Sequence, residues 1–175
     1  YLDAEVMQRI EVHIVGRTLD EPFRETLVKN TRYKDRVRFV GEISREDTIS
    51  YLYGSDVVIS ASRDDPFPVV LVEALCMGKP CIVSDRTGIA ELITEGKNGF
   101  VFGNEDAKAL GAKMPYIARN PGALARIGAE ARSTYEQYLT LPLFEKKLLN
   151  YLNDITEMVS KNRPKPEMVT TLSEG

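Results

Sequence analysis

The sequence predicts an α/β protein with a parallel β-sheet, helices on both faces of the sheet and a helical C-terminus. Short β-branched runs alternate with helical segments between residues 10 and 102, which predicts parallel strands joined by right-handed crossovers. The run DVVIS at 56–60 is apolar enough for a strand that is buried on both faces. After residue 104 the chain carries only helical signals.

The first part of the chain is expected to contain three strands and two helices. Strands are predicted at 10–16 (IEVHIVG), 36–41 (RVRFVG) and 56–60, because β-branched residues dominate these runs. A helix with a proline in its first turn is expected at 20–30, and a second helix at 44–54. Ser44, with Asp47 three residues later, is close to a capping box, and Gly54 ends that helix.

The second part is expected to add two strands and five helices. Strands are predicted at 79–85 and 100–102, with a short helix at 87–96 between them. The helix at 68–77 has Pro68 at its first position and Gly78 past its end, as these residues prefer. Further helices are expected at 105–120, 121–139 and 142–161, and Pro115 is expected to bend or end the first of them.

Composition and charge limit the classes of function. The 175 residues are 43% hydrophobic and 28% charged, which predicts one globular domain at 1–161, followed by a disordered tail or linker at 162–175. The net charge of −3 argues against nucleic-acid binding. No apolar run reaches the roughly 18 residues of a membrane span, and no signal peptide is recognisable. The first ten residues carry neither a cap nor a strand signal, so the chain is expected to be a fragment.

Cysteine usage predicts the compartment and argues against a metal site. Cys76 and Cys81 are expected to be buried free thiols in a reducing cytosol, which places the protein in the cytoplasm. With two cysteines and one histidine, the usual ligands of zinc are too few. We therefore expect neither a metal nor another cofactor.

The stretch SASRDDPFPVVLVEALCMGKP at 60–80 places a single carboxylate in an apolar helix. The apolar residues around Glu73 leave no polar stripe, so the helix is expected to be buried on all sides. A buried carboxylate needs hydrogen-bond donors. Two interpretations stay open: a structural ion pair, for example with Arg63 or Lys79, or a carboxylate at the strand ends that accepts hydrogen bonds from ligand hydroxyls.

The N-terminus of the same helix provides the other half of a candidate site. The N–H groups of Phe67, Val69 and Val70 are expected to be free, and with the helix dipole they favour a phosphate. Asp65 either caps the helix or, because it would repel a phosphate, reaches past it to neutral hydroxyls. A phosphate at a helix start with acids on either side indicates a sugar nucleotide, bound at the carboxyl ends of the strands.

The run from 64 to 102, DDPFPVVLVEALCMGKPCIVSDRTGIAELITEGKNGFVF, resembles the donor-binding half of family 4 (group 1) retaining glycosyltransferases, which have the GT-B fold. That family has two acids eight positions apart, filled here by Asp65 and Glu73. The remaining pattern positions are filled by Phe67, Ala74, Gly78, Pro80, Gly88, Glu91, Gly96 and Gly99. The resemblance extends over roughly residues 10 to 151.

The resemblance implies a Rossmann-like domain, the C-terminal half of a GT-B fold, that binds a UDP- or GDP-sugar without a metal. It implies that Asp65 is the catalytic acid, in contact with donor-sugar hydroxyls, and that Glu73 contacts the ribose. The backbone N–H groups of Phe67, Val69 and Val70 would then hold the sugar or diphosphate. The backbone near Val40 would meet the base.

The chain departs from the family pattern in three places. Asp65 stands where the family has glutamate, and Pro68 stands where it has glycine. The family's first strand of this domain, with its Arg and Lys for the diphosphate, has no counterpart, and neither has the N-terminal acceptor domain. The fragment alone is therefore expected to be inactive.

The parent protein is expected to be a hexosyltransferase of polysaccharide or glycoconjugate biosynthesis that transfers a sugar from its nucleotide to a hydroxyl acceptor. Its partners would be the nucleotide sugar, the missing acceptor domain and, through that domain, a membrane surface. Two alternatives stay open: a non-catalytic GT-B-like binding module, and a fragment of a GT-B-like nucleotide-sugar epimerase.

Overall fold

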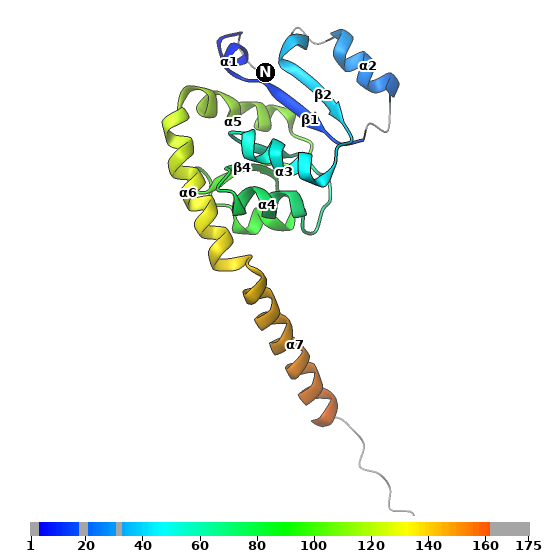
Figure 1. The fold of residues 1–175 in the computed structure, drawn as a ribbon, viewed down its shortest axis with the longest axis vertical. Helices are drawn as coiled ribbons and strands as arrows, with labels where there is room; N and C mark the ends of the chain where they lie inside the picture. Colours follow the sequence, from blue (N-terminus) through cyan, green and yellow to red (C-terminus); the bar gives the residue numbers. More distant parts are fainter. Residues whose placement is uncertain (1–3, 18–20, 31–32, 162–175) are drawn as a thin grey trace, which may run out of the picture. The chain divides into compact units, whose positions relative to one another are not determined.

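The computed structural model describes residues 4–17, 21–30 and 33–161 (Figure 1). Contacts divide the chain into two compact units, one up to Gln137 and one from Tyr138 on. The elements of the first unit are α1 Ala4–Arg9, β1 Val12–Val15, α2 Glu21–Asn30, the 3₁₀ helix η1 Lys34–Arg36, β2 Val37–Gly41, α3 Arg45–Gly54, β3 Val58–Ser60, α4 Val69–Cys76, β4 Cys81–Ser84, the 3₁₀ helix η2 Gly88–Leu92, β5 Gly99–Phe102, α5 Ala107–Arg119 and α6 Pro121–Tyr138, whose last residue opens the second unit. The second unit contains α7 Leu141–Lys161. The tail predicted at 162–175 lies outside the described residues, and the single domain predicted at 1–161 stays a prediction.

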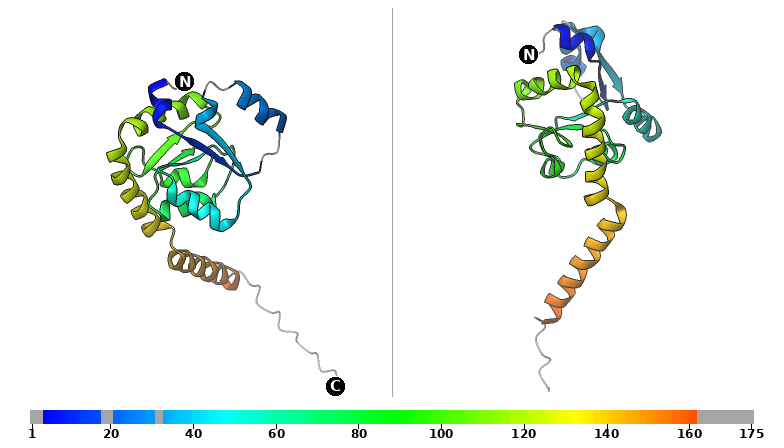
Figure 2. Two further views of the ribbon diagram at one scale, coloured as in Figure 1. Left: turned by 45° about the horizontal axis from the view of Figure 1, so that its top comes forward. Right: turned by 90° about the vertical axis from the view of Figure 1, so that its left-hand side faces the viewer.

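The strands are those that the sequence predicts, and all the pairs between them are parallel. In the part of the chain that the structure describes, they form two sheets, β1-β2 and β3-β4-β5, where the sequence predicts one (Figures 1 and 2). Helices alternate with the strands, so the fold is the predicted Rossmann-like α/β arrangement with a helical C-terminus.

Burial differs along the sheet because it depends on neighbouring strands. The four residues of β4 are all buried, since this strand lies between β3 and β5. The expectation that the run at 56–60 is buried on both faces is wrong. Ile59 is 38% exposed, because β3 is the edge strand of its sheet.

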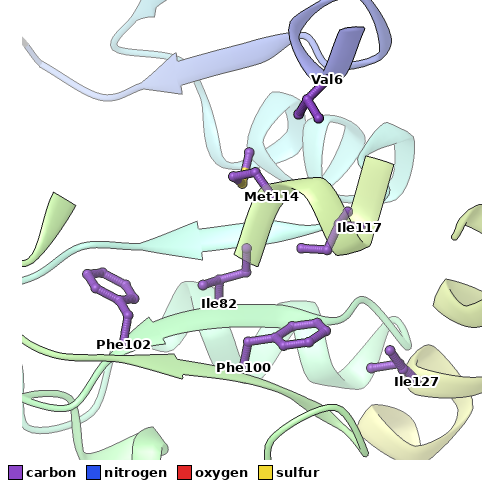
Figure 3. Packing of buried hydrophobic residues seen from close by; sticks show 7 residues of the cluster. All are labelled: Val6, Ile82, Phe100, Phe102, Met114, Ile117 and Ile127. Carbon is purple, nitrogen blue, oxygen red and sulfur yellow. The ribbon is translucent and has the colours of Figure 1, made fainter. Parts of the chain in front are cut away.

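A hydrophobic core cluster is built around β4, β5 and α5 (Figure 3). Its buried members are Val6, Ile82, Phe100, Phe102, Met114, Ile117 and Ile127. Val6 belongs to α1, a six-residue helix that the sequence does not predict, since it carries no cap signal. So short a helix is marginal by itself, and its packing against α5 stabilises it.

A cap residue and a proline were expected to set the bounds of two helices, and only the cap does so. Ser44 caps α3 as predicted, with the Asp47 N–H donating to Ser44 Oγ at 3.0 Å. Pro115 was expected to bend or end its helix; it does not end it, since α5 continues through it to Arg119, and the bend stays a prediction. Met114 and Ile117, on either side of the proline, are buried in the core, and this packing offsets the lost backbone hydrogen bond. No helix among the described residues combines the length and apolarity of a membrane span.

Candidate functional site

The candidate site lies at the carboxyl edge of the β3-β4-β5 sheet, where the loops after β3 and β4 meet. Asp65 and Thr87, from these two loops, form an isolated parallel bridge. The Asp65 N–H donates to the carbonyl oxygen of Arg86 at 3.4 Å, and the Gly88 N–H donates to the carbonyl oxygen of Asp65 at 3.2 Å. The bonds hold the two loops together at the edge where parallel α/β sheets bind ligands.

Gly88 makes the approach of these loops possible. A Cβ atom at this position would overlap the carbonyl oxygen of Pro66, which is backbone and cannot rotate away. The sequence identified Gly88 through its resemblance to a family turn, and the structure supplies the physical reason for a glycine there.

The N-terminus of α4 presents unpaired donors at this edge. Pro68 is the N-cap and makes no side-chain cap hydrogen bond, while its carbonyl oxygen accepts from Leu71 at 3.1 Å. Among the described residues, no acceptor is found for the N–H groups of Val69 and Val70. Val69 is 62% exposed, so these donors lie near solvent at the positive end of the helix dipole. This arrangement suits an anion.

Asp65 has a local structural partner. Its Oδ1 accepts a hydrogen bond from the N–H of Phe67 at 3.1 Å. The expectation of a free N–H group at Phe67 is therefore wrong, and Asp65 caps this turn rather than α4 itself. The cause is the short aspartate side chain, which reaches its own backbone two residues on. The Phe67 ring is half exposed beside this turn.

Glu73 forms an ion pair, with a partner that the sequence did not suggest. Arg45 Nη2, at the start of α3, lies 2.8 Å from Glu73 Oε1. The two suggested partners bind elsewhere: Arg63 pairs with Glu105 and Lys79 donates to the carbonyl oxygen of Tyr53.

The environment of Glu73 is also less buried than expected. The interpretation of a helix buried on all sides is wrong, since the Glu73 side chain is 21% exposed and α4 buries only one face. That face consists of Leu71, Ala74 and Leu75. Glu73 is therefore near enough to solvent to meet a ligand.

Val40 occupies an irregular position in β2. Ile14 pairs with Phe39 and Val15 pairs with Gly41, so Val40 is the residue that the pairing skips. Bulge residues of this kind are left unpaired in the ladder and are common beside functional sites. The next residue, Gly41, has φ of 85°, a conformation that favours glycine.

The structure joins some of the predicted site residues and leaves others apart. It joins the Asp65 turn to the Gly88 loop, and it joins Glu73 on α4 to α3, which follows the β2 strand of Val40. Within the described chain, no hydrogen bond or ion pair links Asp65 to Glu73. Arg45 is the residue that sequence reasoning missed. Its only signal was a cation in the first turn of a helix, where a cation is unfavourable.

Two further features lie outside this arrangement. A shallow hollow of about 500 Å³ is lined by Tyr53 of α3, by the end of α4 with the turn that follows it, and by α6; Cys76, Gly78, Gly128 and Arg132 belong to its lining. It borders the opposite end of α4 from Val69 and Val70. In residues 4–17, 21–30 and 33–161, no group of three or more His, Cys, Asp or Glu side chains is placed to hold a metal ion.

Comparison with solved structures defines the class of fold. HepE from Anabaena in complex with UDP superposes with a TM-score of 0.74 at 21% sequence identity, covering 86% of this chain and 44% of that one. The C-terminal domain of a glycosyl transferase group 1 family protein (LpcC) from Francisella tularensis gives 0.65 at 16% identity, covering 81% of this chain and 96% of that one. The chain has the Rossmann-like fold of a GT-B glycosyltransferase domain.

Sequence comparison gives the family. The family model described as glycosyl transferases group 1 matches residues 2–134, and the chain belongs to this family. N-acetyl-alpha-D-glucosaminyl L-malate synthase of Bacillus anthracis is 32% identical over 114 residues, which are 64% of this chain and 29% of that protein. The chain thus spans less than a third of this relative. The predicted group 1 resemblance is confirmed, while family 4 and the retaining mechanism stay predictions.

Proposed function

We propose that the chain is the donor-binding domain of a retaining family 4 glycosyltransferase, which transfers a sugar from a UDP- or GDP-sugar to a hydroxyl acceptor. The observation that carries the proposal is the pair of N–H groups of Val69 and Val70, for which the described part of the chain offers no acceptor, at the carboxyl edge of the sheet. Carboxylates stand before and after them in the chain, at Asp65 and Glu73. In a group 1 glycosyltransferase this arrangement suits a diphosphate that joins two hydroxyl-rich groups.

Each part of the site has a role in the proposed reaction. The N–H groups of Val69 and Val70 and the dipole of α4 bind the diphosphate, and they stabilise its charge as it departs from the sugar. Glu73 accepts hydrogen bonds from the ribose, and Asp65 and the Phe67 turn meet the donor sugar. The backbone of Val40, at the irregular position of β2, meets the base. The helix N-terminus supplies the positive potential, so the proposed reaction uses neither a metal nor another cofactor.

The complex of HepE with UDP supports a nucleotide as the ligand, since this protein shares the fold over 86% of the present chain. The two free cysteines, Cys76 and Cys81, agree with the proposed cytoplasmic location, where thiols stay reduced.

We also propose that the complete protein contains a further parallel strand between β1 and β3. In the described chain, β1 pairs only with β2, and β3 pairs only with β4. In doubly wound sheets of order 3-2-1-4-5-6, the strands β2-β1 and β3-β4-β5 fit positions 3-2 and 4-5-6. Exposed apolar side chains on both edge strands, Ile14 and Ile59, support this proposal. Hydrogen exchange in the longer protein tests it, with slower exchange expected for β1 and β3 amides than in the 175-residue chain. Equal exchange would contradict it.

The acceptor site belongs, in this proposal, to a part of the protein outside the 175 residues, because the chain spans 29% of the N-acetyl-alpha-D-glucosaminyl L-malate synthase of Bacillus anthracis. We expect the chain alone to consume no donor sugar when it is mixed with a broad set of hydroxyl acceptors. Sustained transfer would contradict this expectation.

Ligand titration followed by backbone amide NMR shifts tests the proposed site. UDP, GDP and their sugars are expected to give saturable shifts at Val69, Val70 and the Val40 region, with a dissociation constant of about 1 mM. Affinity is expected to be this weak because the Arg and Lys with which the family binds the diphosphate have no counterpart in the 175 residues. Shifts confined to the hollow beside Cys76, or none at several millimolar ligand, would refute the site.

The substitution Glu73→Gln separates a ligand contact from a structural ion pair. We expect nucleotide affinity to fall about tenfold, as for one charged hydrogen bond. The free energy of unfolding is expected to change by less than about 1.5 kcal/mol, since the partner Arg45 is largely exposed. A large loss of stability with unchanged affinity would contradict the proposed role.

One observation favours the alternative of a non-catalytic binding module. Asp65 Oδ1 is already engaged by the Phe67 N–H, so only its other oxygen stays available for a sugar hydroxyl. The complete protein discriminates the two functions: a module binds the nucleotide sugar and releases it unchanged, whereas an enzyme transfers the sugar.

A further inference from the structure

The ion pair between Arg45 and Glu73 connects the two halves of the proposed site. Arg45 is the first residue of α3, which follows β2 and its bulge at Val40. Glu73 lies on α4, whose N-terminus presents the Val69 and Val70 donors. The 2.8 Å contact between Nη2 and Oε1 therefore joins the expected base side to the expected diphosphate side.

Stability does not account for this pair. The Arg45 side chain is 71% exposed, and an ion pair as exposed as this contributes little to folding. Arg45 also stands in the first turn of α3, where the positive end of the helix dipole disfavours a cation. The hydrogen bonds between Ser44 and Asp47 already cap α3 without it.

Charge gives the pair a function at the site. A carboxylate next to a bound diphosphate repels it, and because the Glu73 side chain is only 21% exposed, solvent screens this repulsion incompletely. A guanidinium bonded to one carboxylate oxygen cancels most of that charge and restricts the rotamers of the glutamate. The second oxygen of Glu73 stays free of a described partner, so it can still accept a hydrogen bond from a ligand hydroxyl.

We infer that Arg45 is a positioning residue of the donor site: it orients Glu73 and cancels its charge, so that the site selects nucleotides with a diphosphate over uncharged nucleosides. The inference rests on the proposed function. Arg45 is therefore expected to strengthen the binding of the diphosphate and to change the binding of the base and ribose only slightly.

The test compares nucleotides with nucleosides on variants of Arg45. Affinities of the 175-residue chain for UDP, uridine, GDP and guanosine are measured by calorimetry or NMR shifts. Arg45→Gln is expected to weaken diphosphate binding about tenfold and nucleoside binding about twofold or less. Arg45→Lys keeps the charge and is expected to recover most of the loss. Added salt is expected to reduce the difference between Arg45→Gln and the unaltered chain.

Arg38→Gln is the matched control. Arg38 forms another exposed ion pair between distant parts of the chain, 2.5 Å from Glu11, and its substitution changes the net charge equally. We expect it to leave all four affinities unchanged. Equal losses for Arg38→Gln and Arg45→Gln, or equal losses of nucleotide and nucleoside in Arg45→Gln, would overturn the inference.

The outcomes also separate this inference from the proposed function. If the unaltered chain binds no nucleotide at the proposed edge, the proposed function fails and the role of Arg45 fails with it. If the unaltered chain binds and Arg45→Gln binds equally well, only the role of Arg45 is refuted. Unfolding of each variant in urea checks that Arg45→Gln keeps the stability of the unaltered chain.

Discussion

The two sheets of this domain differ sharply although their strands look alike in sequence. In β4, the residues Cys81–Ser84 are all buried, whereas in β1, the residues Val12–Val15, only Val12 is partly buried and the others are exposed. Both strands are short and rich in β-branched residues. The difference shows that strand neighbours and packing decide burial, while β-propensity decides only that a strand forms.

The difference extends to what holds each sheet. Ile82 of β4 and Phe100 of β5 contribute to the core cluster, so hydrophobic packing stabilises the three-stranded sheet. At the start of the two-stranded sheet, Glu11 accepts from His13 at 3.0 Å and pairs with Arg38 at 2.5 Å, all on the surface. The stability of the three-stranded sheet should therefore depend on side-chain volume, and that of the two-stranded sheet on charge.

The largest expected effect comes from removing core volume. Ile82→Ala deletes a fully buried side chain and is expected to cost about 2–5 kcal/mol in the free energy of unfolding. Ile14→Ala in β1 removes a side chain that is 43% exposed, and we expect it to cost less than about 1 kcal/mol. Urea denaturation measures both. Similar costs for the two substitutions would contradict the comparison.

The next effect concerns the edge of the three-stranded sheet, which carries the candidate site. Gly88→Ala introduces a Cβ that overlaps the Pro66 carbonyl oxygen, so the joined loops must move apart. We expect nucleotide affinity to fall more than about tenfold, because the Asp65 turn shifts with them. Gly103→Ala is the control, since its Cβ would meet Asp106 Cβ at an ordinary 3.9 Å. Unchanged affinity in Gly88→Ala would refute the loop contact as part of the site.

The two thiols provide a smaller, pH-dependent contrast. Burial raises the pKa of the Cys81 thiol in β4 to about 12. At pH values up to about 9 this thiol therefore stays protonated in the folded protein and is expected to react with iodoacetamide only after unfolding. Cys76, only partly buried at the end of α4, is expected to be labelled first. Mass spectrometry of timed samples, with Cys76→Ser as the control, detects the order, and simultaneous labelling would contradict it.

The smallest expected effect is electrostatic and belongs to the two-stranded sheet. The hydrogen bond from His13 and the charge of Arg38 lower the pKa of Glu11 from 4.5. A lowered carboxylate pKa stabilises the folded state above the unfolded value, and this contribution is lost as the pH falls below about 4.5. Glu11→Gln is therefore expected to reduce stability slightly at neutral pH and to flatten the acid side of the stability curve. An unchanged acid side in Glu11→Gln would show that the pair contributes nothing.

The sequence by itself predicted the order of the strands and of the α-helices from α2 on, and it indicated where the candidate site lies. Caps, turn residues and β-branched runs act over a few positions along the chain. The roles of Ser44 at the start of α3 and of Gly78 past the end of α4 could therefore be predicted without knowledge of tertiary contacts. The spacing of Asp65 and Glu73 around a helix start predicted that both acids lie near one edge of the sheet. The free donors of Val69 and Val70 follow from the same local geometry.

Only the tertiary structure decided the features that depend on distant residues. Arg45 and Glu73 are 28 positions apart, and no local signal selects Arg45 over Arg63 or Lys79. The separation of the strands into two sheets and the exposure of β1 depend on which neighbours each strand finds. The helix α1 forms because Val6 is buried in the core. Burial and ion pairing are set by contacts across the fold, whereas secondary structure is set largely by neighbours along the chain.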